Sequence, residues 1–248
     1  MKGRSFILGY DPGGDDKHGV AVLEVVRSGG LWRAVKLIPT LSRTVANVKA
    51  MVKKLIGEEG RLVATGIDTL TAWSTGSAGW RPADARLRKE YEAIAKSVDN
   101  ANHINGSMCL NGALILRWLS ERPDKGGLIT EAHPKVCFFA LKQKKERHPW
   151  SKKRNDDEKQ KAAKKKVPLA DKEEAKRWLL DELGISDSVE FGAEDHLFDA
   201  ALGCLAALKG LTGEWTVDLH QPPSADVVHP FGQTHYWWPK AIAQTFKS

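Results

Sequence analysis

The short turns between the first three apolar runs constrain the fold of this chain more than any other feature. The runs at 6–11, 18–26 and 31–37 have the composition of strands, and short stretches rich in Gly, Pro, Ser and Asp separate them. Such short turns join antiparallel neighbours, because a parallel pair needs a crossover of about a dozen residues or more. The chain therefore begins with a three-stranded antiparallel meander.

After residue 43 the apolar period changes from that of a strand to that of a helix. Val45, Val48 and Val52 share one face of a helix expected at 44–55. A meander that leads into right-handed strand–helix–strand crossovers predicts an α/β domain, with a mixed five-stranded sheet and helices on both faces. The further elements that we expect are strands at 61–68 and 127–132 and helices at 86–95, 105–119, 134–141, 171–183 and 195–209.

Positive charge is concentrated in one segment. The chain carries a net charge of +7, and residues 142–166 hold 12 Lys or Arg against 4 Asp or Glu. We therefore read residues 1–248 as one domain with a Lys-rich insertion at about 142–168 and an irregular tail at about 211–248. The insertion is either a solvated charged loop or an arm that binds an acidic polymer such as DNA or RNA.

The remaining composition indicates a folded cytoplasmic protein. Hydrophobic residues make up 42% and charged residues 28% of the chain, which suits a packed core. No apolar run approaches the ~20 residues of a membrane helix, and no signal peptide opens the sequence, so we expect no membrane partner. Cys109, Cys137 and Cys204 lie in apolar runs and are expected to be buried, inert thiols.

Three acidic residues stand where predicted strands end. Asp11 closes the first strand, Asp68 the fourth and Glu131 the fifth. Parallel neighbours present their carboxyl ends at the same edge of a sheet, where ligands usually bind. A single acid there is often a turn or cap residue, but crowded carboxylates repel one another and usually imply a cation.

The last predicted helix adds a second group of polar residues. His196 and Asp199 are three residues apart and share a helix face. Glu194 and Asp195 have the ordinary alternative of capping the helix N-terminus, whereas Asp199 lies inside the helix. We therefore expect Asp199 to be a metal ligand, and leave Asp195 open between ligand and cap.

These residues resemble a bacterial family of uncharacterised domains that are predicted to be ribonuclease-H-like nucleases. The resemblance covers roughly residues 5–141 and 171–209. More distantly, His196 and Asp199 resemble the helical pair of the RuvC branch of that superfamily. The stretches that carry the resemblance are Gly9-Tyr10-Asp11, Gly66-Ile67-Asp68, the segment 81–87, Thr130-Glu131-Ala132-His133-Pro134 and the segment 195–207.

The resemblance implies a ribonuclease-H-like fold and a metal-dependent nuclease. Two Mg²⁺ or Mn²⁺ ions about 3.5–4 Å apart would activate a water and stabilise the leaving oxygen of a phosphodiester. Asp11 would bridge the ions, with Asp68 and Asp199 beside it. Glu131 would complete the shell or orient a water, and His196 is either a general base or a plain helix-surface histidine.

Basic and aromatic residues near this edge are candidates for contacts with nucleic acid. Trp and Arg side chains in a loop can stack on bases and hold phosphates, although core packing or loop capping explains them equally well. The residues that we single out are Trp73, Trp80, Arg81, Arg86 and Arg88 after the fourth strand, and Lys152, Lys153 and Arg154 in the insertion.

Three other functions remain open from the sequence. A nucleic-acid-binding module would keep the fold without turnover. An actin-like ATPase or sugar kinase would share the Asp11-Pro12-Gly13 turn, but such enzymes need two domains and this chain has room for one. A junction resolvase would act as a homodimer.

Overall fold

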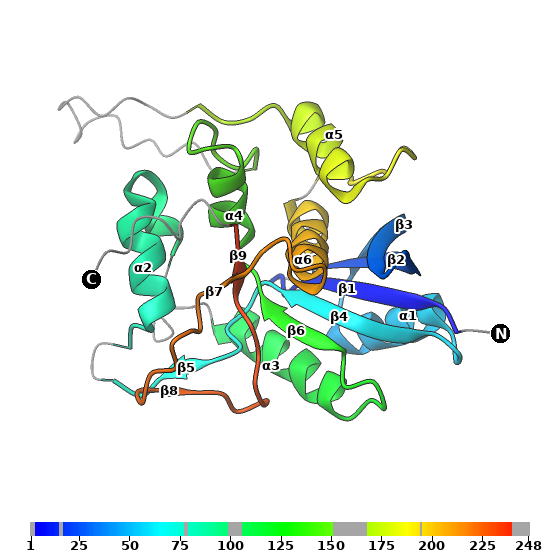
Figure 1. The fold of residues 1–248 in the computed structure, drawn as a ribbon, viewed down its shortest axis with the longest axis horizontal. Helices are drawn as coiled ribbons and strands as arrows, with labels where there is room; N and C mark the ends of the chain where they lie inside the picture. The colour runs from blue at the N-terminus through cyan, green and yellow to red at the C-terminus, as the bar shows by residue number, and fades with distance from the viewer. Residues whose placement is uncertain are drawn as a thin grey trace.

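A computed structural model describes residues 3–14, 17–76, 79–98, 106–150, 168–193 and 195–239. A five-stranded mixed sheet forms its centre, in the order β3-β2-β1-β4-β6 (Figure 1). The strands are β1 (Ser5–Asp11), β2 (His18–Ser28), β3 (Leu31–Ser42), β4 (Arg61–Ile67) and β6 (Leu128–Glu131). The first three are antiparallel neighbours, and β1, β4 and β6 run parallel, as the sequence predicted.

Helices cover both faces of this sheet (Figure 1). On one face, α1 (Val45–Ile56) and α3 (Gly106–Ser120) pack on alternate residues of β1, among them Phe6 and Leu8. On the other, α6 (Asp195–Leu211) packs on the face of β1 that includes Ile7, and α5 (Lys172–Leu183) packs against α6. This alternation follows from the pleat of a strand, which points successive side chains to opposite faces. Asp171 and Thr44 cap α5 and α1 through their side-chain oxygens.

Glycine residues let α6 lie unusually close to the sheet. A Cβ atom on Gly9 of β1 would overlap the carbonyl oxygen of Ala200, and one on Gly66 of β4 would overlap that of Gly203. Gly19 of β2 faces the backbone of His196 in the same way. The backbone of α6 therefore rests directly on three neighbouring strands.

The segment after Asp68 differs from the expected helix at 86–95. It forms β5 (Trp73–Ser74), α2 (Pro82–Glu90) and the 3-10 helix η1 (Glu92–Ser97). Pro82 occupies the first turn of α2, where a missing N–H is tolerated. Tyr91, with φ −116° and ψ 51°, then interrupts the helix. A short helix, α4 (Pro134–Leu141), follows β6 as predicted.

The described part of the C-terminal tail, up to residue 239, contributes several side chains to the core, although its sequence shows no period. It contains β7 (Val217–Asp218), β8 (Val227–Val228) and β9 (Trp237–Trp238). β8 pairs with β5, and β7 pairs with β9. The backbone of His235 exchanges hydrogen bonds of 2.8 Å with Ile129 and Glu131, which extends the sheet beyond β6. Buried Trp238 then packs beside Tyr91.

Two further features bear on the sequence predictions. Cys137 and Cys204 are buried and Cys109 is partly exposed; all three are free, and burial raises the pKa of each thiol.

Within the described ranges, no helix combines the length and apolarity that crossing a bilayer would require. Residues 151–167, which hold Lys152, Lys153 and Arg154, lie outside the described residues.

The close approach of α6 makes Gly66 a sensitive position. We expect Gly66→Ala to lower the free energy of unfolding by roughly 1–3 kcal/mol or more, because the new methyl group would displace α6. Urea unfolding measures the change. Gly106→Ala is the matched control, since a Cβ there meets nothing within 4 Å, and it should change stability by less than about 1 kcal/mol. Equal effects of the two variants would contradict the close packing.

Candidate active site

Asp11 and Asp68 lie side by side at the carboxyl edge of the sheet. The parallel register pairs Tyr10 with Ile67, and the N–H of Asp68 donates to the carbonyl of Tyr10 at 2.9 Å. The two acids therefore leave neighbouring strands at the same level. Figure 1 shows the ends of β1, β4 and β6 pointing the same way, with α2 and α4 beyond that edge.

The first turns of α6 bring His196 and Asp199 to this edge. The Nδ1 atom of His196 lies 2.7 Å from Oδ2 of Asp11, and its Nε2 atom lies 3.8 Å from Oδ1 of Asp195. The contact with Asp11 raises the pKa of His196. In the free protein this favours the imidazolium, which is not the form that a general base needs.

Burial leaves the negative charges of Asp11 and Asp68 incompletely compensated. Loss of hydration, with a contribution from Asp199, raises the pKa of Asp11 to about 6, although its bond to His196 opposes the shift. Burial, Asp11 and Asp199 likewise raise the pKa of Asp68 well above its usual value. Carboxylates that have lost hydration and lie near other acids favour either a shared proton or a cation.

Asp199 has a different partner, which sequence reasoning missed. Oδ1 of Asp199 lies 2.7 Å from Nε2 of His148, a residue at the start of the Lys-rich insertion. The His148 ring is buried between Phe138 and Phe198, and its Nδ1 atom faces the N–H of Trp150 at 3.4 Å. Burial alone would raise the pKa of Asp199, but His148 holds it below its usual range. His148 therefore keeps Asp199 ionised and fixes its orientation.

Lys135 is a second site residue that the sequence did not reveal. It stands in the first turn of α4, and its Nζ atom lies 3.6 Å from Oδ2 of Asp195. Burial would lower the pKa of its amine, but Asp199, Asp195, Asp68 and Asp11 raise it. The only sequence signal was its place four residues after the end of β6.

Glu131 is paired with Arg81, whereas its position at the end of β6 predicted a place in the metal shell. The guanidinium of Arg81 donates to its two carboxylate oxygens at 2.6 and 2.7 Å, and the N–H of Thr71 donates at 2.9 Å. Arg81 also holds both oxygens of Asp84 at 2.7 Å. Burial would raise the pKa of Glu131, yet Arg81 lowers it. The negative charge of Glu131 is thus paired with the guanidinium of Arg81, and Glu131 has a structural role.

The same ion pair removes Arg81 from the set of surface contacts. Arg81 is 1% exposed and its guanidinium is engaged by the two carboxylates, so it is not available to a phosphate. Trp73 packs edge-on against Phe231, and Arg86 donates to the carbonyl of Gln221. Trp73 thus has a packing role, and Arg86 caps a backbone carbonyl.

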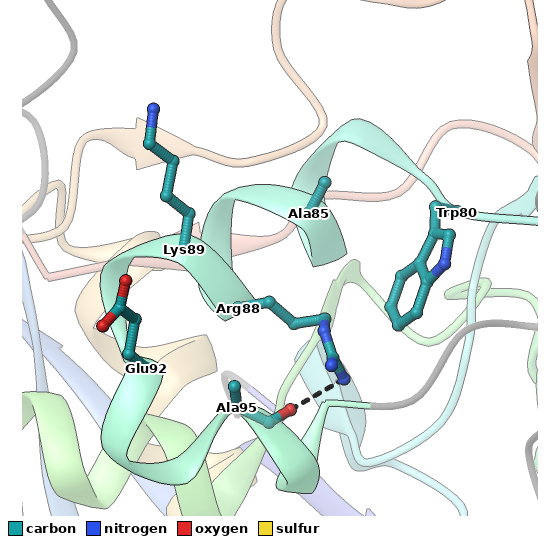
Figure 2. A pocket seen from close by; sticks show the side chains of 6 residues that line it. All are labelled: Trp80, Ala85, Arg88, Lys89, Glu92 and Ala95. Atoms are coloured by element: carbon teal, nitrogen blue, oxygen red, sulfur yellow. Dashed lines mark hydrogen bonds between the residues drawn. The ribbon is translucent and has the colours of Figure 1, made fainter.

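Trp80 and Arg88 line an open pocket of about 440 Å³ between α2 and η1 (Figure 2). The guanidinium of Arg88 lies 4.8 Å from the centre of the Trp80 ring and donates to the carbonyls of Ala95 and Val98. The exposed Lys89 borders the same pocket. This pair of expected contacts for nucleic acid therefore lies beside an open space.

The acids match a hard divalent cation in chemistry and charge. Carboxylate oxygens are the donors that Mg²⁺ and Mn²⁺ prefer, and the pKa values of Asp11 and Asp68 reflect a shortage of positive charge. Across the part of the chain that the structure describes, no three His, Cys, Asp or Glu side chains form a ready-made ligand group. His196 contacts one oxygen of Asp11 and His148 one oxygen of Asp199, so the other oxygen of each carboxylate is the one that would face a cation.

Comparison with known proteins adds no family. No protein-family model matches the chain, and no curated protein matches it in sequence. The function of the chain is therefore inferred from the residues of the site.

The raised pKa values predict how stability depends on pH. Since Asp11 and Asp68 hold their protons more tightly when folded, their contribution is largest below pH ~4 and is lost as pH rises through the folded-state values. Asp68→Asn removes one partly buried charge, so in EDTA we expect it to raise the melting temperature at pH 7.5 by several degrees and to change it little at pH 4. The exposed Asp187→Asn is the control. Equal shifts at both pH values would contradict the burial of an uncompensated charge.

Proposed function

We propose that this protein is a metal-dependent nuclease that hydrolyses phosphodiester bonds in DNA or RNA. The observations that carry the proposal are the positions of Asp11 and Asp68 at the ends of neighbouring parallel strands and the raised pKa values of both, which burial and nearby carboxylates such as Asp199 cause. A structural role gives no reason to hold these charges together, whereas a site for cations does.

The topology supports placing the chain among ribonuclease-H-like folds. An antiparallel meander, two parallel strands beside it and helices on both faces match the expected arrangement. Fold alone does not assign chemistry, so the proposal depends on the carboxylates rather than on the resemblance. We place the activity in the cytoplasm, in keeping with three free cysteines.

In the proposed mechanism Asp11, Asp68 and Asp199 hold two Mg²⁺ or Mn²⁺ ions. Bound ions of this kind lower the pKa of a coordinated water and stabilise the leaving oxygen of a phosphodiester. His148 keeps Asp199 ionised and oriented, as partners of metal ligands commonly do. Asp195 borders the site through His196 and Lys135, and Glu131 holds the neighbouring loop through Arg81.

Asp11→Asn tests the carboxylate site. We expect it to abolish Mn²⁺-dependent cleavage of end-labelled single-stranded and duplex oligonucleotides. The neutral amide of asparagine neither balances the charge of a cation nor bridges two cations. Asp187→Asn, exposed and remote from the edge, should cleave like the wild type. Unchanged cleavage by Asp11→Asn would remove Asp11 from the mechanism. Binding of oligonucleotide without cleavage by the wild type would instead indicate a non-catalytic binding module.

The Lys-rich segment at 142–166 is the proposed phosphate-binding arm. We expect replacement of Lys152, Lys153 and Arg154 by Gln to weaken oligonucleotide binding and to reduce the slope of log affinity against log salt by about 2–3, since each lost phosphate contact contributes about 0.7–0.9. Replacement of the three exposed residues Arg43, Lys53 and Lys54 is the control. Fluorescence anisotropy at several salt concentrations measures the slope, and equal slopes would exclude the arm.

A further inference from the structure

Lys135 occupies a position that a cation does not favour by itself. It lies in the first turn of α4, where the helix dipole is positive and acidic residues are preferred. Its side chain is 41% exposed, so its amine could extend into water. Instead its Nζ atom lies toward Asp195, at the edge where the buried carboxylates meet.

The contact between Lys135 and Asp195 is loose. At 3.6 Å it is longer than the ~2.7–2.9 Å of a charge-assisted hydrogen bond, and the Asp195 side chain is itself 25% exposed. Exposed ion pairs of this kind contribute about 0–1 kcal/mol. The pairs of Arg81 with Glu131 and of His148 with Asp199 are shorter and buried. Lys135 is therefore the one of these cations that can exchange its partner at little cost.

A substrate phosphate meets an electrostatic barrier at this edge. Asp11, Asp68, Asp195 and Asp199 are anionic when ionised, and a phosphodiester carries a further negative charge. Bound cations reduce the repulsion between the carboxylates but also compete with Lys135 for them. A lysine released from Asp195 is in place to meet the phosphate, and the positive end of α4 acts in the same direction.

We propose that Lys135 is a catalytic residue that leaves Asp195 and binds a non-bridging oxygen of the scissile phosphate. This inference rests on the proposed nuclease function. Lys135 thereby has two opposed effects: it neutralises the carboxylates in the free protein, which weakens cation binding, and it stabilises the anionic phosphate, which promotes cleavage. A residue needed only for folding would not separate these effects.

Lys135→Met tests the inference, because methionine keeps the length of the side chain and removes its charge. We expect isothermal titration to show about fivefold tighter Mn²⁺ binding, the effect of removing one nearby positive charge. At saturating Mn²⁺ we expect kcat/KM for a labelled oligonucleotide to fall about a hundredfold or more. Lys135→Arg should recover most of the cleavage. Lys54→Met, an exposed lysine on α1, should leave both quantities unchanged.

The outcomes separate the two proposals. Cleavage by Lys135→Met within threefold of the wild type, or Mn²⁺ binding that is unchanged or weaker, would overturn the role of Lys135 while leaving the nuclease in place. A wild type that neither binds Mn²⁺ nor cleaves would overturn the nuclease itself. That outcome would overturn the role of Lys135 as well, because the lysine leaves Asp195 only when cations bind the carboxylates.

Discussion

The candidate site depends on the direct contact between the backbone of α6 and the central strands. Gly9 and Gly66 remove the side chains that would otherwise hold the helix away, and Gly203 does the same from the helix. At this separation the first turns of α6 reach the carboxyl edge, where His196 meets Asp11 at 2.7 Å. The packing of the core and the assembly of the site therefore depend on the same contact between α6 and the strands. A displaced helix would also move Asp199 away from the carboxyl edge.

The acidic residues at the carboxyl edge fall into two groups. Glu131 is neutralised by Arg81 and anchors the loop that carries α2, so its charge stabilises the fold. Asp11 and Asp68 remain short of positive charge and cost stability near neutral pH. A fold tolerates such strain where it serves function, because the same arrangement that destabilises the free protein provides affinity for a cation.

Most of the sheet and its helices were predictable from periodicity and turns, and so was the position of Asp11 and Asp68 at the ends of neighbouring parallel strands. The roles of Glu131 and Lys135 were not, because they depend on partners such as Arg81 and Asp195, 50 and 60 positions away in the sequence. His148 was hidden within a Lys-rich segment that we read as either a solvated loop or an arm that binds an acidic polymer. The tail lacks a period because its strands are two residues long, yet it extends the sheet edge.

The central claim is that the acids at this edge bind cations together. A crystal structure of the protein soaked in Mn²⁺, with anomalous scattering to locate the ions, tests it most directly. The account predicts peaks ligated by Asp11, Asp68 and Asp199, with Glu131 still bonded to Arg81. An edge without a peak at saturating Mn²⁺, with the His196–Asp11 and His148–Asp199 contacts intact, would contradict it.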